Sequence, residues 1–92
     1  MWKGQWDALP GAELIRQGIR DAETGQESIA ALVVSIGAAR LARCGLVVAH
    51  AFDGPERRLY DLLQNEHGDG AHSKYNALLR RLMRFERSVE SA

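Results

Sequence analysis

The chain has 92 residues, a length that suits one domain, residues 1–92, and leaves no room for a second. Its 12 basic and 12 acidic residues balance, so we expect no overall electric field that favours nucleic acid or a membrane surface. A single cysteine, Cys44, excludes an internal disulfide and a multi-cysteine metal site.

The sequence favours a cytoplasmic protein. No apolar leader follows the first basic residue, and the longest uncharged stretch, residues 28–39, is too short to cross a bilayer. The excess of arginine over lysine is typical of a GC-rich bacterial genome. A chain this short buries a small core, so pairing with a second copy would add to its stability.

Residues 1–8 are predicted to form an N-terminal lead. Trp2 and Trp6 lie in it, and burying both rings requires the lead to pack back on the body of the domain.

The first helix is predicted to begin at Pro10, where a missing N–H costs nothing, and to run to about Thr24. Gly25 follows as a C-terminal cap residue. Gly18 falls on the apolar face of this helix, where it would let another helix approach closely.

Residues 29–36 are almost all apolar and are predicted to form the central buried helix, which Ser28 or Gln26 could start. A strand is the alternative, because Val33, Val34 and Ile36 are β-branched. A helix that continued through Gly37 would bury Arg40 and Arg43, so a break at Gly37 is expected.

After the break, a short helix over residues 38–44 would turn Leu41 inward and both arginines outward. Leu46–Phe52 then forms a short apolar extended connector, or an edge that pairs with another copy. Asp53 can cap the next helix, which carries Pro55 in its first turn and stops near Gly68.

The last helix, residues 72–90 and capped by Asp69, has the clearest amphipathic pattern in the chain. Its apolar residues cover an arc wider than one packing seam needs, and its arginines lie on the other side. The apolar face consists of Tyr75, Leu78, Leu79, Leu82, Met83, Phe85 and Val89.

Glu86 falls inside this apolar arc. We expect the helix to leave the core near its end, so that Glu86 is solvated. One alternative is a buried, paired carboxylate, for which a tyrosine hydroxyl, a tryptophan N–H or one of Arg40, Arg43, Arg57 and Arg58 could be the partner. The other is a functional carboxylate.

His67, Asp69 and His72 are candidate metal ligands, because histidine and carboxylate are the donors that zinc prefers. Their spacing matches neither the His-x3-His pattern of a helix nor a calcium loop. A simpler interpretation assigns His67 to a helix end and Asp69 to a helix start.

A basic face on the last helix offers possible phosphate contacts through Arg80, Arg84 and Arg87, with Lys74 and Arg81 nearby. Exposed aromatic residues are not interleaved with these arginines. A solvated face that makes local ion pairs is therefore favoured over a nucleic-acid surface.

No catalytic or cofactor motif is visible. Cys44 has no oxyanion motif beside it, and its place at a helix C-terminus would raise the thiol pKa, so a small buried apolar role is favoured.

These observations predict an all-α fold, a compact domain of four to five helices in orthogonal or bundle-like packing, centred on the last helix and on residues 29–36. The favoured function is a non-catalytic protein-interaction module that self-associates, with no cofactor and no membrane. The alternatives are nucleic-acid binding through the arginine face and a small metal-dependent or carboxylate/histidine enzyme. The interaction residues are expected to be Tyr75, Leu79, Met83 and Glu86.

Overall fold

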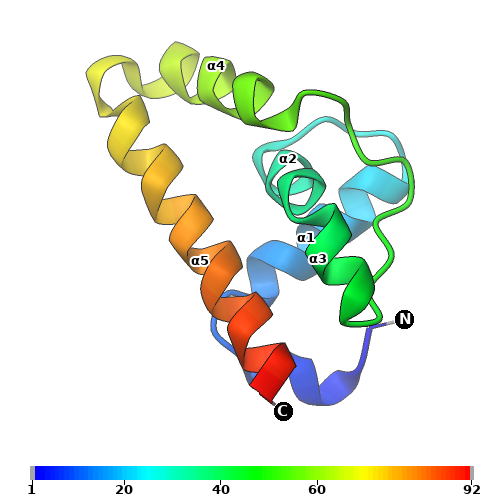
Figure 1. Ribbon diagram of the computed structural model, residues 1–92. Coiled ribbons are helices and arrows are strands. Elements are labelled where there is room, and N and C mark those ends of the chain that lie inside the picture. Colours follow the sequence, from blue (N-terminus) through cyan, green and yellow to red (C-terminus); the bar gives the residue numbers. More distant parts are fainter. Residues whose placement is uncertain (1, 92) are drawn as a thin grey trace.

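A computed structural model describes residues 2–91 and shows an all-α fold with no strand in that range (Figure 1). The predicted fold class is therefore confirmed. The five α-helices are α1 (Ala12–Glu23), α2 (Ile29–Ile36), α3 (Ala38–Arg43), α4 (Pro55–His67) and α5 (Ala71–Ser91), with two short 3-10 helices, η1 (Gly4–Ala8) and η2 (Gly68–Gly70). No helix within residues 2–91 is long and apolar enough to span a membrane.

The helices are arranged as a V, with α4 and α5 as its two arms and the other helices packed in its opening. α4 and α5 diverge from η2, and α2 lies between the open arms with α1 and α3 beside it (Figure 1). α2 packs mainly on α1 and α4, whereas α5 packs mainly on α4. The centre is therefore α2, and α5 contributes less of the core than its long apolar face predicted.

Two glycines allow the helices to pack this closely. A Cβ added to Gly18 of α1 would lie 2.2 Å from the backbone oxygen of Ala30, so α1 and α2 touch through their main chains. Gly11, with φ 79°, precedes α1, and a Cβ there would lie 2.8 Å from the backbone oxygen of Arg81 in α5. The prediction for Gly18 is confirmed, and α1 begins at Ala12, two residues later than predicted.

The helix starts are explained only in part by side-chain caps. Ser28 caps α2, because its hydroxyl accepts a hydrogen bond from the Ala31 N–H at 3.1 Å. The prediction that Asp53 caps α4 is wrong: the cap residue is Gly54, which has left-handed backbone and makes no side-chain cap bond. Asp69 lies inside η2, one residue too early to cap α5, whose first residue is Ala71.

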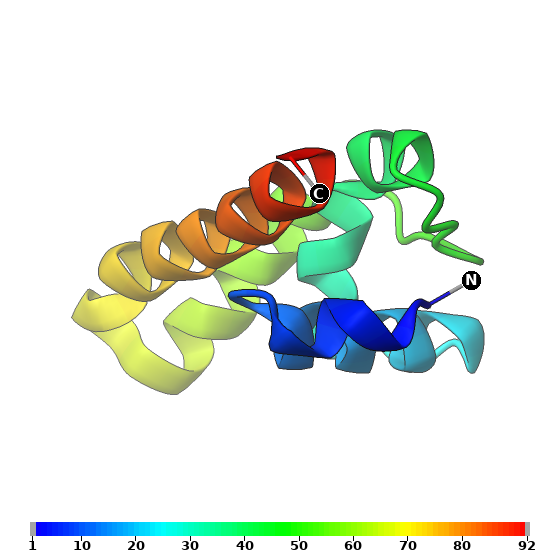
Figure 2. The same ribbon diagram turned by 90° about the horizontal axis from the view of Figure 1, so that it is seen from below.

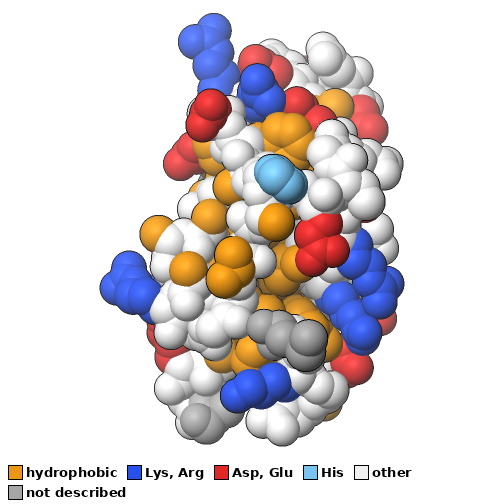
Figure 3. Space-filling view, turned by 90° about the vertical axis from the view of Figure 1, so that its right-hand side faces the viewer, with side chains coloured by type: hydrophobic (Ala, Val, Ile, Leu, Met, Phe, Trp, Pro, Cys, Tyr) orange, Lys and Arg blue, Asp and Glu red, His pale blue; other side chains and the backbone are white. Residues whose placement is uncertain are grey.

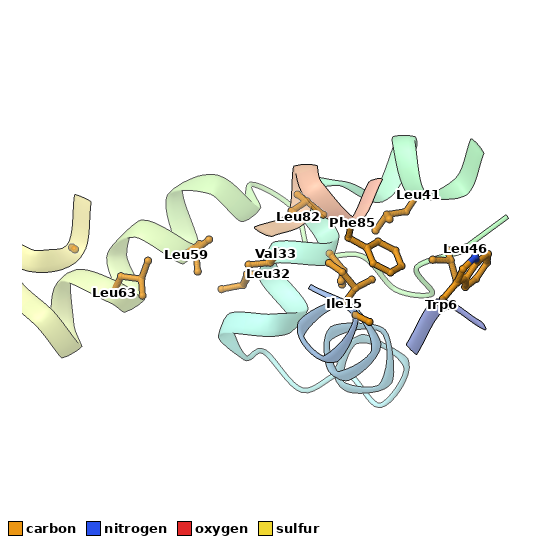
Figure 4. Close-up of a cluster of buried hydrophobic side chains, with 13 residues drawn as sticks. Trp6, Ile15, Leu32, Val33, Leu41, Leu46, Leu59, Leu63, Leu82 and Phe85 are labelled. Carbon is orange, nitrogen blue, oxygen red and sulfur yellow. The ribbon is translucent and has the colours of Figure 1, made fainter. Parts of the chain in front are cut away.

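The buried side chains form an elongated row. Figure 4 shows it running from Leu63 on α4, through Leu32 and Val33 on α2, to Trp6 in the N-terminal segment. Trp6 is buried, and the ring of Trp2 stacks on Phe85 of α5 with 5.6 Å between centroids. The N-terminal segment thus covers one end of the core.

The connector between α3 and α4 is fixed by Ser35, a buried polar residue of α2. Its hydroxyl donates to the Ala31 carbonyl at 2.8 Å and accepts from the Phe52 N–H at 3.0 Å. At the other end, the Leu46 N–H donates to the Leu41 carbonyl at 2.9 Å. The connector is therefore held at both ends while its middle runs over the surface.

Candidate functional site

A groove of about 340 Å³ lies between α5 and the α2–α3 corner. Figure 2 shows α3 beside the C-terminal end of α5, where the groove is formed. Most of its walls are apolar, and charged groups lie at its floor and rim. Its lining residues are Ile36, Gly37, Ala39, Arg40, Arg43, Leu79, Leu82, Met83 and Glu86.

The predicted break at Gly37 separates α2 from α3 and allows α3 to lie beside α5. α2 ends at Ile36 and α3 begins at Ala38, as the sequence indicated. A Cβ at Gly37 would lie 2.8 Å from the Glu86 Oε2 atom and 2.9 Å from the Leu82 Cδ1 atom. Glycine here leaves room for the side chains of α5 at the floor of the groove.

Glu86 is buried, with only 3% of its surface exposed, so the expectation that it is solvated is wrong. The reason is that the α2–α3 corner covers the end of α5, which helical periodicity alone does not reveal. Arg40 is the nearest cation, with 3.5 Å between its Nη1 atom and the Glu86 Oε1 atom. The hydrogen bonds of Arg40 go to Glu90 instead: its Nε and Nη2 atoms donate to that carboxylate at 2.8 and 2.7 Å.

This geometry leaves the Glu86 carboxylate short of donors. No side chain or backbone N–H within residues 2–91 donates a hydrogen bond to it. No fully enclosed side-chain nitrogen or oxygen in that range lacks a partner, so the unbonded Glu86 oxygens reach the groove. A nearly buried acceptor therefore faces an apolar groove.

The pKa values of this cluster move in opposite directions. Burial raises the pKa of Glu86 above its ordinary value; Arg40 lowers it and Glu90 raises it further. The hydrogen bond from Arg40 lowers the pKa of Glu90. Burial, followed by the negative charges of Glu90 and Glu86, raises the pKa of the half-buried Cys44 thiol. A raised pKa disfavours the thiolate form that a nucleophilic cysteine needs.

The raised pKa of Glu86 predicts how stability changes with pH. Its contribution to the free energy of unfolding is full below the ordinary carboxyl pKa and is lost as the pH rises through the raised value. Glu86→Gln removes this loss, so the variant should be more stable than the wild type at neutral pH and equally stable in acid. Urea unfolding at several pH values measures the difference.

Glu90→Gln is the matched control, because a lowered pKa gives the opposite sign. This variant should be less stable than the wild type at neutral pH, with the gap closing as the pH falls through the lowered pKa. A neutral-pH loss of stability in Glu86→Gln would mean that the ion pair with Arg40 outweighs the cost of burial.

Three of the four predicted interaction residues meet in the groove. Leu79, Met83 and Glu86 line it, and 40% of the Met83 surface is exposed. Tyr75 lies elsewhere: its ring packs edge-on against Tyr60 of α4 with 5.7 Å between centroids. The α3 side of the groove was missed, because both of its arginines were expected to point away from the domain.

The basic face of α5 is open to solvent. Arg80, Arg84 and Arg87 are exposed, and none of them makes an ion pair or side-chain hydrogen bond within the described part of the chain. The expected solvated face is present, but the expected local ion pairs are not formed among residues 2–91. The three guanidinium groups remain available to an anion.

The three candidate metal ligands lie around the turn between α4 and α5. His67, Asp69 and His72 are all exposed, and the His72 Nε2 atom lies 3.2 Å from the amide nitrogen of Asn76. From residue 2 to residue 91, no group of three or more His, Cys, Asp or Glu side chains is placed to hold a metal ion.

A second apolar surface lies on the connector. Val47 is 71% exposed, and it borders a groove of about 460 Å³ between the connector, α1 and Trp2. Figure 3 shows the face on which the connector runs, with hydrophobic side chains along its middle and both acidic and basic groups at its margins. The groove is lined by Trp2, Arg16, Ile19, Arg20, Glu23, Leu46, Val47 and Ala49.

Comparison of the chain with protein-family models, with curated proteins and with solved structures finds no match.

Proposed function

We propose that this protein is a non-catalytic protein-interaction module that self-associates through the connector face. The observation that carries the proposal is the exposure of Val47, 71% of whose surface is open, beside the groove of about 460 Å³. Leaving a β-branched hydrophobic side chain in water forgoes about 1.5 kcal/mol or more of burial free energy, which a partner surface would recover.

A second copy of the chain fits this face on electrostatic grounds. A two-fold contact sets a patch against itself, so a patch of one sign would repel its own copy. This groove carries Arg16 and Arg20 together with Glu23, so both signs are present at one rim. Arg16 is already neutralised by Asp7 at 3.0 Å.

Sedimentation equilibrium tests the proposal. The wild type should show a mass above that of the monomer that rises between low and several hundred micromolar protein, and Val47→Glu should return it to the monomer. Met83→Glu places the same charge on the other large hydrophobic residue that is exposed within residues 2–91 and should leave the assembly unchanged. A wild type that stays monomeric throughout this range contradicts self-association.

Binding of nucleic acid is the second candidate function, favoured by the unpaired arginines of α5. It predicts retention on single-stranded RNA or DNA that falls steeply with salt, because each phosphate contact releases counterions. Arg80→Glu combined with Arg84→Glu should abolish retention, whereas Arg57→Glu on α4 should not. The absence of retention by the wild type at low salt excludes this function.

We also propose a cytoplasmic location. The single cysteine, which cannot form an internal disulfide, supports it.

A further inference from the structure

The α3–α5 groove has the composition of a binding site for one side chain. Its walls include Ile36, Leu79 and Met83, and its floor is Glu86, 3% exposed and without a hydrogen-bond donor from residues 2–91. Water hydrates the oxygens of so deeply buried a carboxylate poorly, and a ligand that donates a hydrogen bond to them offsets this loss of hydration. The groove therefore selects an apolar group that carries a hydrogen-bond donor.

The charges around Glu86 disfavour a cationic ligand. Arg40 already lies 3.5 Å from the carboxylate, and Arg43 lines the same groove, so an incoming lysine or arginine would meet no net negative charge. The negative charges of Glu86 and Glu90 balance these two arginines. A neutral N–H or O–H donor satisfies Glu86 without disturbing that balance.

The size and lining of the groove favour an aromatic body for this donor. A volume of about 340 Å³ accommodates one large side chain. The Met83 thioether supplies the sulfur contact that aromatic rings favour. Arg43 is exposed and makes no ion pair or hydrogen bond within residues 2–91, so its guanidinium is available to lie against a ring face.

We propose that the α3–α5 groove receives a tryptophan or tyrosine side chain of another protein, whose indole N–H or phenol O–H donates a hydrogen bond to Glu86. The chain's own tryptophan and tyrosine rings are packed elsewhere in the domain. Trp2 stacks on Phe85 and donates to Asp7 at 2.9 Å, and Trp6 is buried. The two tyrosines pack on each other. The occupant is therefore a different protein, and this site is independent of self-association through Val47.

Titration of the native protein with blocked amino acids, monitored through its amide chemical shifts by NMR, tests the proposal. N-acetyl-tryptophanamide and N-acetyl-tyrosinamide should give saturable shifts around the groove with a Kd on the order of 1 mM. N-acetyl-phenylalaninamide and the 1-methyl-indole analogue of the tryptophan probe cannot donate from the ring. Their affinity should fall by about tenfold or more, because the acceptor is charged.

Variants of the groove complete the experiment. Glu86→Met should reduce the affinity for the tryptophan probe to that of its 1-methyl analogue, and Met83→Glu should abolish saturable binding. Val47→Glu, on the connector face, should bind normally and tests the site in the absence of self-association. The comparison between the tryptophan probe and its methylated analogue needs no variant, so it holds even where Glu86→Met does not fold.

Three results overturn the proposal. The first is the absence of saturable shifts at the groove. The second is equal affinity of the tryptophan probe and its methylated analogue, which removes the role of Glu86. The third is tighter binding of N-acetyl-lysinamide than of the aromatic probes, which shows a site for a cation.

Discussion

Phe85→Ala is expected to remove about 4 kcal/mol from the free energy of unfolding, within the range for a large aromatic core residue. Phe85 is fully buried, and its ring stacks on Trp2, which in turn contacts Trp6 edge-on at 5.5 Å. Truncation therefore leaves a cavity and also detaches the N-terminal segment from α5. The free energy of unfolding of a domain this size is about 5–15 kcal/mol in total, so the variant would lose much of its stability.

Urea unfolding, monitored by tryptophan fluorescence, measures this loss of stability. The emission of the folded variant should also shift to longer wavelength, because Trp2 loses the ring that shields it. Phe52→Ala is the matched control. Phe52 is only half-buried and stacks on the exposed Arg58, so this variant should lose clearly less free energy of unfolding than Phe85→Ala. Equal losses in the two variants would contradict the central place of Phe85 in the core.

Gly18→Ala is expected to destabilise the protein by about 3 kcal/mol or more, although alanine is the better helix former by about 1 kcal/mol. The new methyl group would lie 2.2 Å from the Ala30 carbonyl oxygen and 2.7 Å from the Val34 Cγ1 atom. The nearest atom is backbone, so α1 and α2 would have to separate. This cost exceeds the gain in helix propensity.

Thermal unfolding checks the result, with Gly4→Ala as the control. An added Cβ at Gly4 meets nothing within 4 Å, and its φ is not in the left-handed range, so the control should unfold as the wild type does. A Gly18→Ala protein as stable as the wild type would mean that the close crossing of α1 and α2 is not required.

Local signals in the sequence were enough to predict the helices. The buried run over residues 29–36 and the break at Gly37 were both placed correctly, and Ser28 was one of the two candidate caps, because each depends on neighbouring residues alone. Gly18 was placed on the contact face of α1 by helical periodicity. The start of α1 was missed because Gly11 takes its left-handed backbone where α5 approaches, which is a tertiary effect.

Only the α5 side of the groove could be predicted from the sequence. The periodicity of α5 placed Leu79, Met83 and Glu86 on one side of a helix, but it could not say what covers them. Burial of Glu86 depends on Arg40 and the α2–α3 corner, which is about fifty residues away in the chain. A row of apolar residues interrupted by one carboxylate was the available signal, and it was interpreted as the helix leaving the core.

The two anchors of the connector have a consequence for recognition. With one end bound to Leu41 and the other to the Ser35 hydroxyl, the segment that carries Val47 is already ordered before any partner arrives. Docking on a preorganised segment avoids most of the entropy that a flexible loop would lose on binding. In the proposed self-association, the hydroxyl of Ser35, enclosed within the domain, would thus strengthen contacts made on its surface.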